Sequence, residues 1–281
     1  TIISDGVLVD TAVPSAGSVS DSTAADLDWT KSTTTLTAVW TGFSDALSGI
    51  QKYEYAIGDT SGGTDVLSWT DNATATSVNK TGLTLTSGTT YYISVRATDN
   101  VGNISAIATS DGITVDTDGP VIGYVVDSDT GDINWSNVTT ALSLSWDDFS
   151  DTLSGLSYYE YAVGTTTGGT ETIGWTTASR SDSTAAESSL SLVNTTTYYA
   201  SVRAVDSVAN VSSIANSDGF TIDTDLPQIV YVNEGSAALD MDIQNVDSVL
   251  TAGWQGTDTS PGSDIDRSEE HTSELQSRET I

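Results

Sequence analysis

Two pairs of aspartates stand two residues apart, and they are the residues of this chain whose spacing most suggests chemistry. Asp116 and Asp118 form one pair, and Asp223 and Asp225 form the other. In an extended chain, residues at this spacing project from the same side, within several ångströms of each other. Two like charges held so close disfavour the ionised state of both carboxylates, unless a cation neutralises them.

Calcium suits such a pair, because it takes about six to eight oxygen ligands at about 2.3–2.6 Å. Further ligands are expected from other acidic and amide side chains of the repeats. The sequence therefore predicts candidate calcium ligands at Asp116, Asp118, Asp223, Asp225, Asp99, Asn103, Asp206 and Asn210. A solvated acidic hinge that keeps neighbouring domains apart is the alternative interpretation, and it stays open.

Two tryptophans are candidate ligand-binding residues, because each follows a glycine-rich turn. Trp69 lies in GGTDVLSWT, and Trp175 lies in GGTETIGWT. A flat indole beside such a turn can stack on a sugar ring. The competing interpretation is that each indole caps the end of a hydrophobic core.

Catalysis is not expected. The single histidine is His271 and the chain has no cysteine, so a Ser-His-Asp triad and a thiol nucleophile are both excluded for the rest of the chain. Asp147 and Asp148 are adjacent carboxylates, but glycoside cleavage needs two of them about 5–9.5 Å apart across a cleft. The corresponding residues 106 positions earlier are Thr41 and Gly42.

The charge of the chain excludes two classes of partner. The formal net charge is −31, with 39 acidic and 8 basic residues. Such a chain repels phosphate backbones and anionic membrane surfaces, so neither nucleic acid nor a membrane is an expected partner. There is also no run of about 18 apolar residues that would span a membrane as a helix.

An eleven-residue segment recurs three times and divides the chain into repeats. It reads SDGVLVDTAVP, SDGITVDTDGP and SDGFTIDTDLP, and each copy ends in proline, at Pro14, Pro120 and Pro227. A period of about 106 residues is the length of a whole domain. Proline and the residue before it favour an extended hinge between modules.

The period predicts five segments. They are the last strand of a preceding repeat, two complete repeats, the start of a third repeat, and a non-native tail: 1–11, 12–118, 119–225, 226–266 and 267–281. The tail includes RSEEHTSELQS, which looks like the translation of a common sequencing adapter. We therefore exclude it from the reasoning about the fold.

Apolar residues alternate with Thr and Ser over short runs, which is typical of strands with one buried face. Leu36, Ala38 and Trp40 share one face, and Tyr53 and Tyr55 share another. The sequence therefore predicts an all-β fold of tandem antiparallel β-sandwiches, with about seven strands each.

The segment TGLTLTSGTTYYISVRATD, residues 81–99, resembles the E–F region of fibronectin type III and bacterial immunoglobulin-like repeats. The resemblance implies that Tyr91 and Tyr198 are corner tyrosines, whose hydroxyl groups bond to backbone upstream. The turn has Ser87 where the type III pattern often has proline, and this difference favours repeats of a large bacterial extracellular protein.

The function expected from these observations is a non-catalytic, adhesin-like spacer or stalk on a secreted or cell-surface bacterial protein, with joints that calcium stiffens. Its expected partners are the neighbouring repeats and a surface polysaccharide or protein. The alternative is a carbohydrate- or surface-binding accessory module of a polysaccharide-degrading enzyme.

Overall fold

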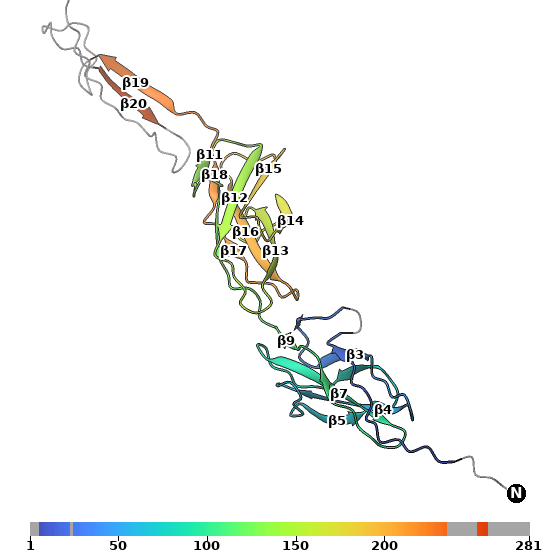
Figure 1. Ribbon diagram of the computed structural model, residues 1–281. Coiled ribbons are helices and arrows are strands. Elements are labelled where there is room, and N and C mark those ends of the chain that lie inside the picture. Colours follow the sequence, from blue (N-terminus) through green and yellow to red (C-terminus); the bar gives the residue numbers. More distant parts are fainter. Residues whose placement is uncertain (1–5, 23–24, 235–251, 258–281) are drawn as a thin grey trace, which may run out of the picture. The chain divides into compact units, whose positions relative to one another are not determined.

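The computed structural model describes residues 6–22, 25–234 and 252–257. Two compact units make up the chain. The first contains residues 1–122, 149–159 and 203–213, and the second contains 123–148, 160–202 and 214–281. Within the described residues no helix is long and apolar enough to cross a membrane. Figure 1 shows the strands of the described segments.

The first repeat is a sandwich of two sheets. The smaller sheet has the strand order β1 (Ser18–Ser20), β3 (Thr35–Thr41), β6 (Ser77–Thr81). The larger sheet has the order β2 (Trp29–Thr30), β9 (Ile113–Val115), β7 (Thr90–Asp99), β4 (Ile50–Gly58), β5 (Leu67–Asp71), and β8 (Ala108–Thr109) also pairs with β7.

The second repeat has the same topology. Its smaller sheet has the order β10 (Tyr124–Val126), β12 (Ala141–Asp147), β15 (Thr184–Ser188). Its larger sheet has the order β11 (Trp135–Ser136), β18 (Phe220–Ile222), β16 (Thr197–Asp206), β13 (Leu156–Gly164), β14 (Ile173–Ser179), with β17 (Ala215–Asn216) against β16. The expected all-β fold of tandem sandwiches is therefore confirmed.

The first and last strands of each repeat are each divided in two, so each repeat has nine labelled strands among its described residues, where about seven were expected. β1 pairs with β3 in the smaller sheet, whereas β2 pairs with β9 in the larger sheet and runs parallel to it. The first strand thus changes sheets between Ser20 and Trp29. In the second repeat β10 and β11 make the same change, and β11 is parallel to β18.

The core of each repeat lies between its sheets and contains the alternating residues that the sequence indicated. In the first repeat, Trp40 of β3 packs edge-on against Tyr53 of β4, with 5.8 Å between ring centroids. The second core includes Val163 and Ile222. The corner tyrosines are confirmed, because Thr86 N donates to Tyr91 Oη at 2.9 Å and Val193 N donates to Tyr198 Oη at 2.9 Å.

Beyond the second repeat, β19 (Gln228–Glu234) pairs antiparallel with β20 (Ala252–Thr257). Most of the expected third repeat, the whole of the adapter-like tail and the first residues of segment 1–11 lie outside the described residues. The five segment boundaries stay a prediction.

Candidate functional site

Two groups of three aspartates, which we call the linker triads, are built alike in the two repeats. The first triad is Asp10, Asp45 and Asp99, and the second is Asp116, Asp151 and Asp206. Within each triad, one carboxylate oxygen from each residue lies within 4.8 Å of the others. All six residues belong to the first compact unit.

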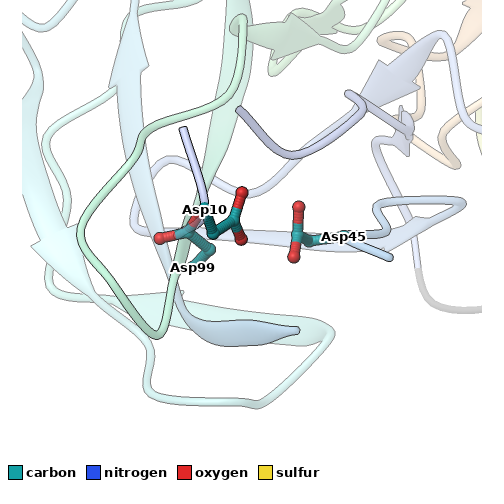
Figure 2. Close-up of side chains that lie close together, drawn as sticks. All are labelled: Asp10, Asp45 and Asp99. Carbon is teal, nitrogen blue, oxygen red and sulfur yellow. The ribbon is translucent and has the colours of Figure 1, made fainter. Parts of the chain in front are cut away.

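Three separate segments bring the first triad together, as Figure 2 shows. Asp10 lies in the segment that leads into the first repeat, Asp45 lies in the turn between β3 and β4, and Asp99 is the last residue of β7. The strand pairing of β4 with β7, in which Ile50 lies opposite Asp99, sets the end of β7 beside that turn.

Hydrogen bonds from backbone amides hold each carboxylate of the first triad. Asp45 Oδ1 accepts from Ser48 N and Gly49 N, both at 2.8 Å. Asp99 Oδ1 accepts from Asn103 N at 2.8 Å. Asp10 Oδ2 accepts from Ser48 N at 3.1 Å, and this bond ties the incoming segment to the turn.

These bonds lower the pKa of two of the three carboxylates. The amide of Gly49, followed by that of Ser48, holds the pKa of Asp45 below its usual range. Burial alone would raise the pKa of Asp99, but hydrogen bonds from the side chain and backbone of Asn103 outweigh it, so the net shift is downward. Two of the three groups are thus held as anions.

The second triad repeats this arrangement. Asp116 Oδ2 accepts from Ser154 N at 3.1 Å, as Asp10 does from Ser48. Asp151 Oδ1 accepts from Gly155 N at 2.7 Å, and Asp206 Oδ1 accepts from Asn210 N at 2.7 Å. Asp116 and Asp206 are buried. Three carboxylates therefore converge where little water can screen them.

The structure brings some of the expected calcium ligands together and separates others. Asp116 lies with Asp206, as expected. Asp118 does not join them, because its Oδ2 accepts from Ser87 Oγ at 3.0 Å. Asp225 is placed in the same way, since its Oδ1 accepts from Asn194 Nδ2 at 3.1 Å. Asp223 heads the third linker, and its Oδ1 accepts from Asp225 N.

The two expected asparagine ligands act mainly as donors. Asn103 Nδ2 donates to Asp99 Oδ2 at 2.8 Å and to Ala12 O at 3.0 Å. Asn210 Nδ2 donates to Asp206 Oδ2 at 2.8 Å and to Asp116 O at 3.1 Å. Each asparagine thus orients one triad carboxylate and fixes the linker backbone beside it.

Three members of the triads were not among the expected ligands. They are Asp10, Asp45 and Asp151. The sequence contained a signal for Asp45 and Asp151, because the recurring segments DALSG and DTLSG place an aspartate at the same position of each repeat. Asp10 was hidden because the first linker carries Ala12 where the other linkers carry a second aspartate.

Trp69 lies on β5, on the outer side of the larger sheet. The guanidinium carbon of Arg96 stands 4.3 Å from its ring centroid, and Arg96 Nε donates to Glu54 Oε2 at 3.0 Å. Along β7, Arg96 alternates with the core residues Val95 and Ala97. The Trp69 ring therefore has one face covered by a cation. Trp175 occupies the corresponding position on β14.

No family model matches the chain. The chain is similar to exoglucanase B of Cellulomonas fimi, with 30% identity over 263 residues, which is 92% of this chain and 21% of that protein. It therefore spans about a fifth of the length of the curated relative.

Two solved structures are also similar. One is the chicken CNTN1 FN1–FN3 domains, with 17% identity and a TM-score of 0.27, covering 86% of this chain and 75% of that one. The other is the CbhA fibronectin(III)-like modules of Clostridium thermocellum, with 13% identity and a TM-score of 0.34, covering 73% of this chain and 94% of that one.

Proposed function

We propose that these tandem fibronectin type III-like repeats are non-catalytic spacer modules of a longer bacterial protein that is secreted or held at the cell surface. The observation that carries the proposal is the duplication of the linker triads. In each repeat a hydrogen bond ties the incoming linker to a turn, which lies between β3 and β4 in the first repeat and between β12 and β13 in the second. Such a feature suits a role in connecting modules rather than in catalysis.

A non-catalytic role also agrees with the placement of the adjacent acids. Asp147 ends β12, and its Oδ1 accepts from the amide of Asp148 at 2.8 Å. Both carboxylates are exposed on one turn, whereas a glycosidase needs an acid and a base on opposite sides of a bound sugar.

The similarity to a segment of exoglucanase B favours one setting for the spacer, which is a polysaccharide-degrading enzyme of several modules. In that setting the repeats separate other modules of the same chain. It also favours a second candidate function, carbohydrate binding at Trp69 and Trp175. Arg96 leaves at most one face of the Trp69 ring for a sugar.

A glycan array and a pull-down on insoluble cellulose, both with the full chain, distinguish these functions. The spacer is expected to show no retention and no binding of oligosaccharides at about millimolar concentration. Retention that the double variant W69A/W175A abolishes would replace the spacer with a carbohydrate-binding module.

Within the spacer, we assign calcium to the linker triads. Oxygens that share one calcium ion at about 2.3–2.6 Å lie at most about 5 Å apart, and the triad oxygens meet that limit. Three carboxylates that are close together and partly desolvated repel one another, and a divalent cation offsets that repulsion. Bound calcium would thus fix each linker to the turn and the strand end beside it.

Small-angle scattering and thermal melting of the full chain test this assignment. With about 5 mM calcium, the chain is expected to have a higher melting temperature and a different maximum dimension from the same chain with chelator. The variant D45N/D151N keeps the amide-accepting oxygens and is expected to lose the change in maximum dimension and to show a smaller rise in melting temperature. D59N/D182N removes two exposed acids outside the triads and is expected to keep both responses. Identical curves with calcium and with chelator would remove calcium from the linkers.

A further inference from the structure

A second pair of acidic groups lies where the first strand of each repeat changes sheets. We call them the crossover clusters. One is Asp127, Asp132 and Asp218 in the second unit, and its counterpart is Asp21, Asp26 and Asp111 in the first unit. In each cluster, one carboxylate oxygen per residue lies within 4.8 Å of the others.

The clusters come from three places in the sequence of each repeat. Asp127 directly follows β10, Asp132 precedes β11, and Asp218 lies between β17 and β18. The two divided strands therefore meet at this point. Asp132 and Asp218 are exposed, whereas the side chain of Asp127 is buried.

The buried aspartate of each cluster has an unsatisfied oxygen. Asp127 is 2% exposed, and its Oδ2 accepts from Gly219 N at 3.0 Å, but its Oδ1 has no hydrogen-bond partner. Asp21 is 1% exposed, its Oδ2 accepts from Gly112 N at 2.9 Å, and its Oδ1 is likewise without a partner. The same oxygen is unsatisfied in both copies.

An unpaired oxygen on a buried carboxylate is costly, because it has lost its water without gaining a donor. Among the described residues, no lysine or arginine pairs with any of the six cluster aspartates. Two further carboxylates add negative charge beside each buried one. A bound cation would satisfy the free oxygen and, at the same time, offset the repulsion between the carboxylates.

We propose that each crossover cluster binds one calcium ion through carboxylate oxygens of its three aspartates. The ligands are all oxygens, which suits a hard cation such as calcium. The buried aspartate is the inner ligand, and the two exposed aspartates approach the ion from the solvent side. These sites use none of the linker-triad residues, so the proposal stands independently of calcium at the linkers.

Burial raises the pKa of Asp127 to about 6, against the hydrogen bond from the amide of Gly219, which lowers it. Burial likewise raises the pKa of Asp21 to about 6. Both shifts have the same main cause, which is the burial of the two carboxylates.

Backbone amides that donate to the ligating carboxylates make the test specific to each site. In an ¹⁵N-labelled full chain titrated with calcium chloride to about 10 mM, the amide signals of Gly219 and Gly112 are expected to shift and to saturate. Gly49 and Gly155 donate to Asp45 and Asp151, so their signals report the linker triads separately.

The variant D132N/D218N supplies a control within one molecule. It removes two charges from exposed positions of the second repeat and leaves the first repeat unchanged. Calcium affinity measured at Gly219 is expected to fall at least about tenfold, while the response at Gly112 stays as it was.

Any of three results would overturn the proposal. The amide signal of Gly219 could show no saturable shift with calcium, or D132N/D218N could have the same calcium affinity at Gly219 as the unchanged chain. The third is that sodium chloride of matched ionic strength shifts the Gly219 signal as much as calcium chloride does. A response at Gly219 without one at Gly155 would reject calcium at the linkers and keep the crossover site.

Discussion

A single exchanged residue changes the partner of one core tyrosine between the repeats. Tyr161 Oη donates to Glu187 Oε1 at 2.6 Å. Burial first, and then Glu187, raise the pKa of Tyr161 to about 12. In the first repeat the residue that corresponds to Glu187 is Lys80, and Tyr55 has no such bond, so burial alone raises its pKa.

The substitution Tyr161→Phe is therefore expected to lower the stability of the second repeat by about 1–2 kcal/mol. Tyr55→Phe is the matched control and is expected to be nearly neutral. The folded pKa lies above the ordinary value of 10.0. The contribution of Tyr161 is thus complete below about pH 10 and is lost as the pH rises towards 12. Urea unfolding at several pH values measures it, and equal losses in both variants would contradict the assignment.

At the scale of elements, the divided last strand depends on one glycine in each repeat. Between β17 and β18 the chain turns at Ser217, Asp218 and Gly219, and Ser217 Oγ accepts from Ala200 N at 2.9 Å. Gly219 has φ of 93°, a value that favours glycine. A Cβ there would lie 2.6 Å from Tyr199 Cε1.

Gly219→Ala is expected to destabilise the second repeat by about 2–3 kcal/mol, through backbone strain and the contact with Tyr199. Gly168→Ala provides the comparison, because Gly168 also has positive φ but faces open space. It should cost about 1 kcal/mol. Thermal unfolding of both variants measures the two losses of stability. A loss for Gly219→Ala no larger than that for Gly168→Ala would show that the Tyr199 ring moves aside without cost.

At the scale of the whole molecule, each repeat has a core built from its own residues. The first core cluster runs from Leu36 to Val115 in the sequence. A core cluster of the second repeat includes Val163 and Ile222, and Leu144 and Trp146 are also buried in that repeat. Separate cores allow each repeat to unfold by itself.

Calorimetry of the full chain is expected to resolve two transitions. Leu85 and Leu192 occupy corresponding buried positions, 5% and 6% exposed. Leu85→Ala and Leu192→Ala are each expected to lower the stability of one repeat by about 2–4 kcal/mol and to leave the other transition in place. A single transition that both variants shift equally would mean that the repeats unfold together.

The repeated pattern, the strands and their buried faces could be predicted from the amino-acid sequence. Alternation along a strand is a local property, so Leu36, Ala38 and Trp40 could be assigned to one buried face without knowledge of their partners. The corner hydrogen bond of Tyr91 was expected from the resemblance to fibronectin type III repeats, and its donor and acceptor lie five residues apart in the sequence.

Which acidic residues lie together could not be predicted in this way, because it depends on how the strands pair. Asp10, Asp45 and Asp99 converge because strand pairing sets one loop beside the end of another strand, and that register is not encoded in the spacing of the acids themselves. The sequence pattern paired Asp116 with Asp118, yet Asp118 bonds to Ser87 instead. The unsatisfied oxygens of Asp21 and Asp127 were equally invisible, because burial at a strand crossing depends on both sheets at once.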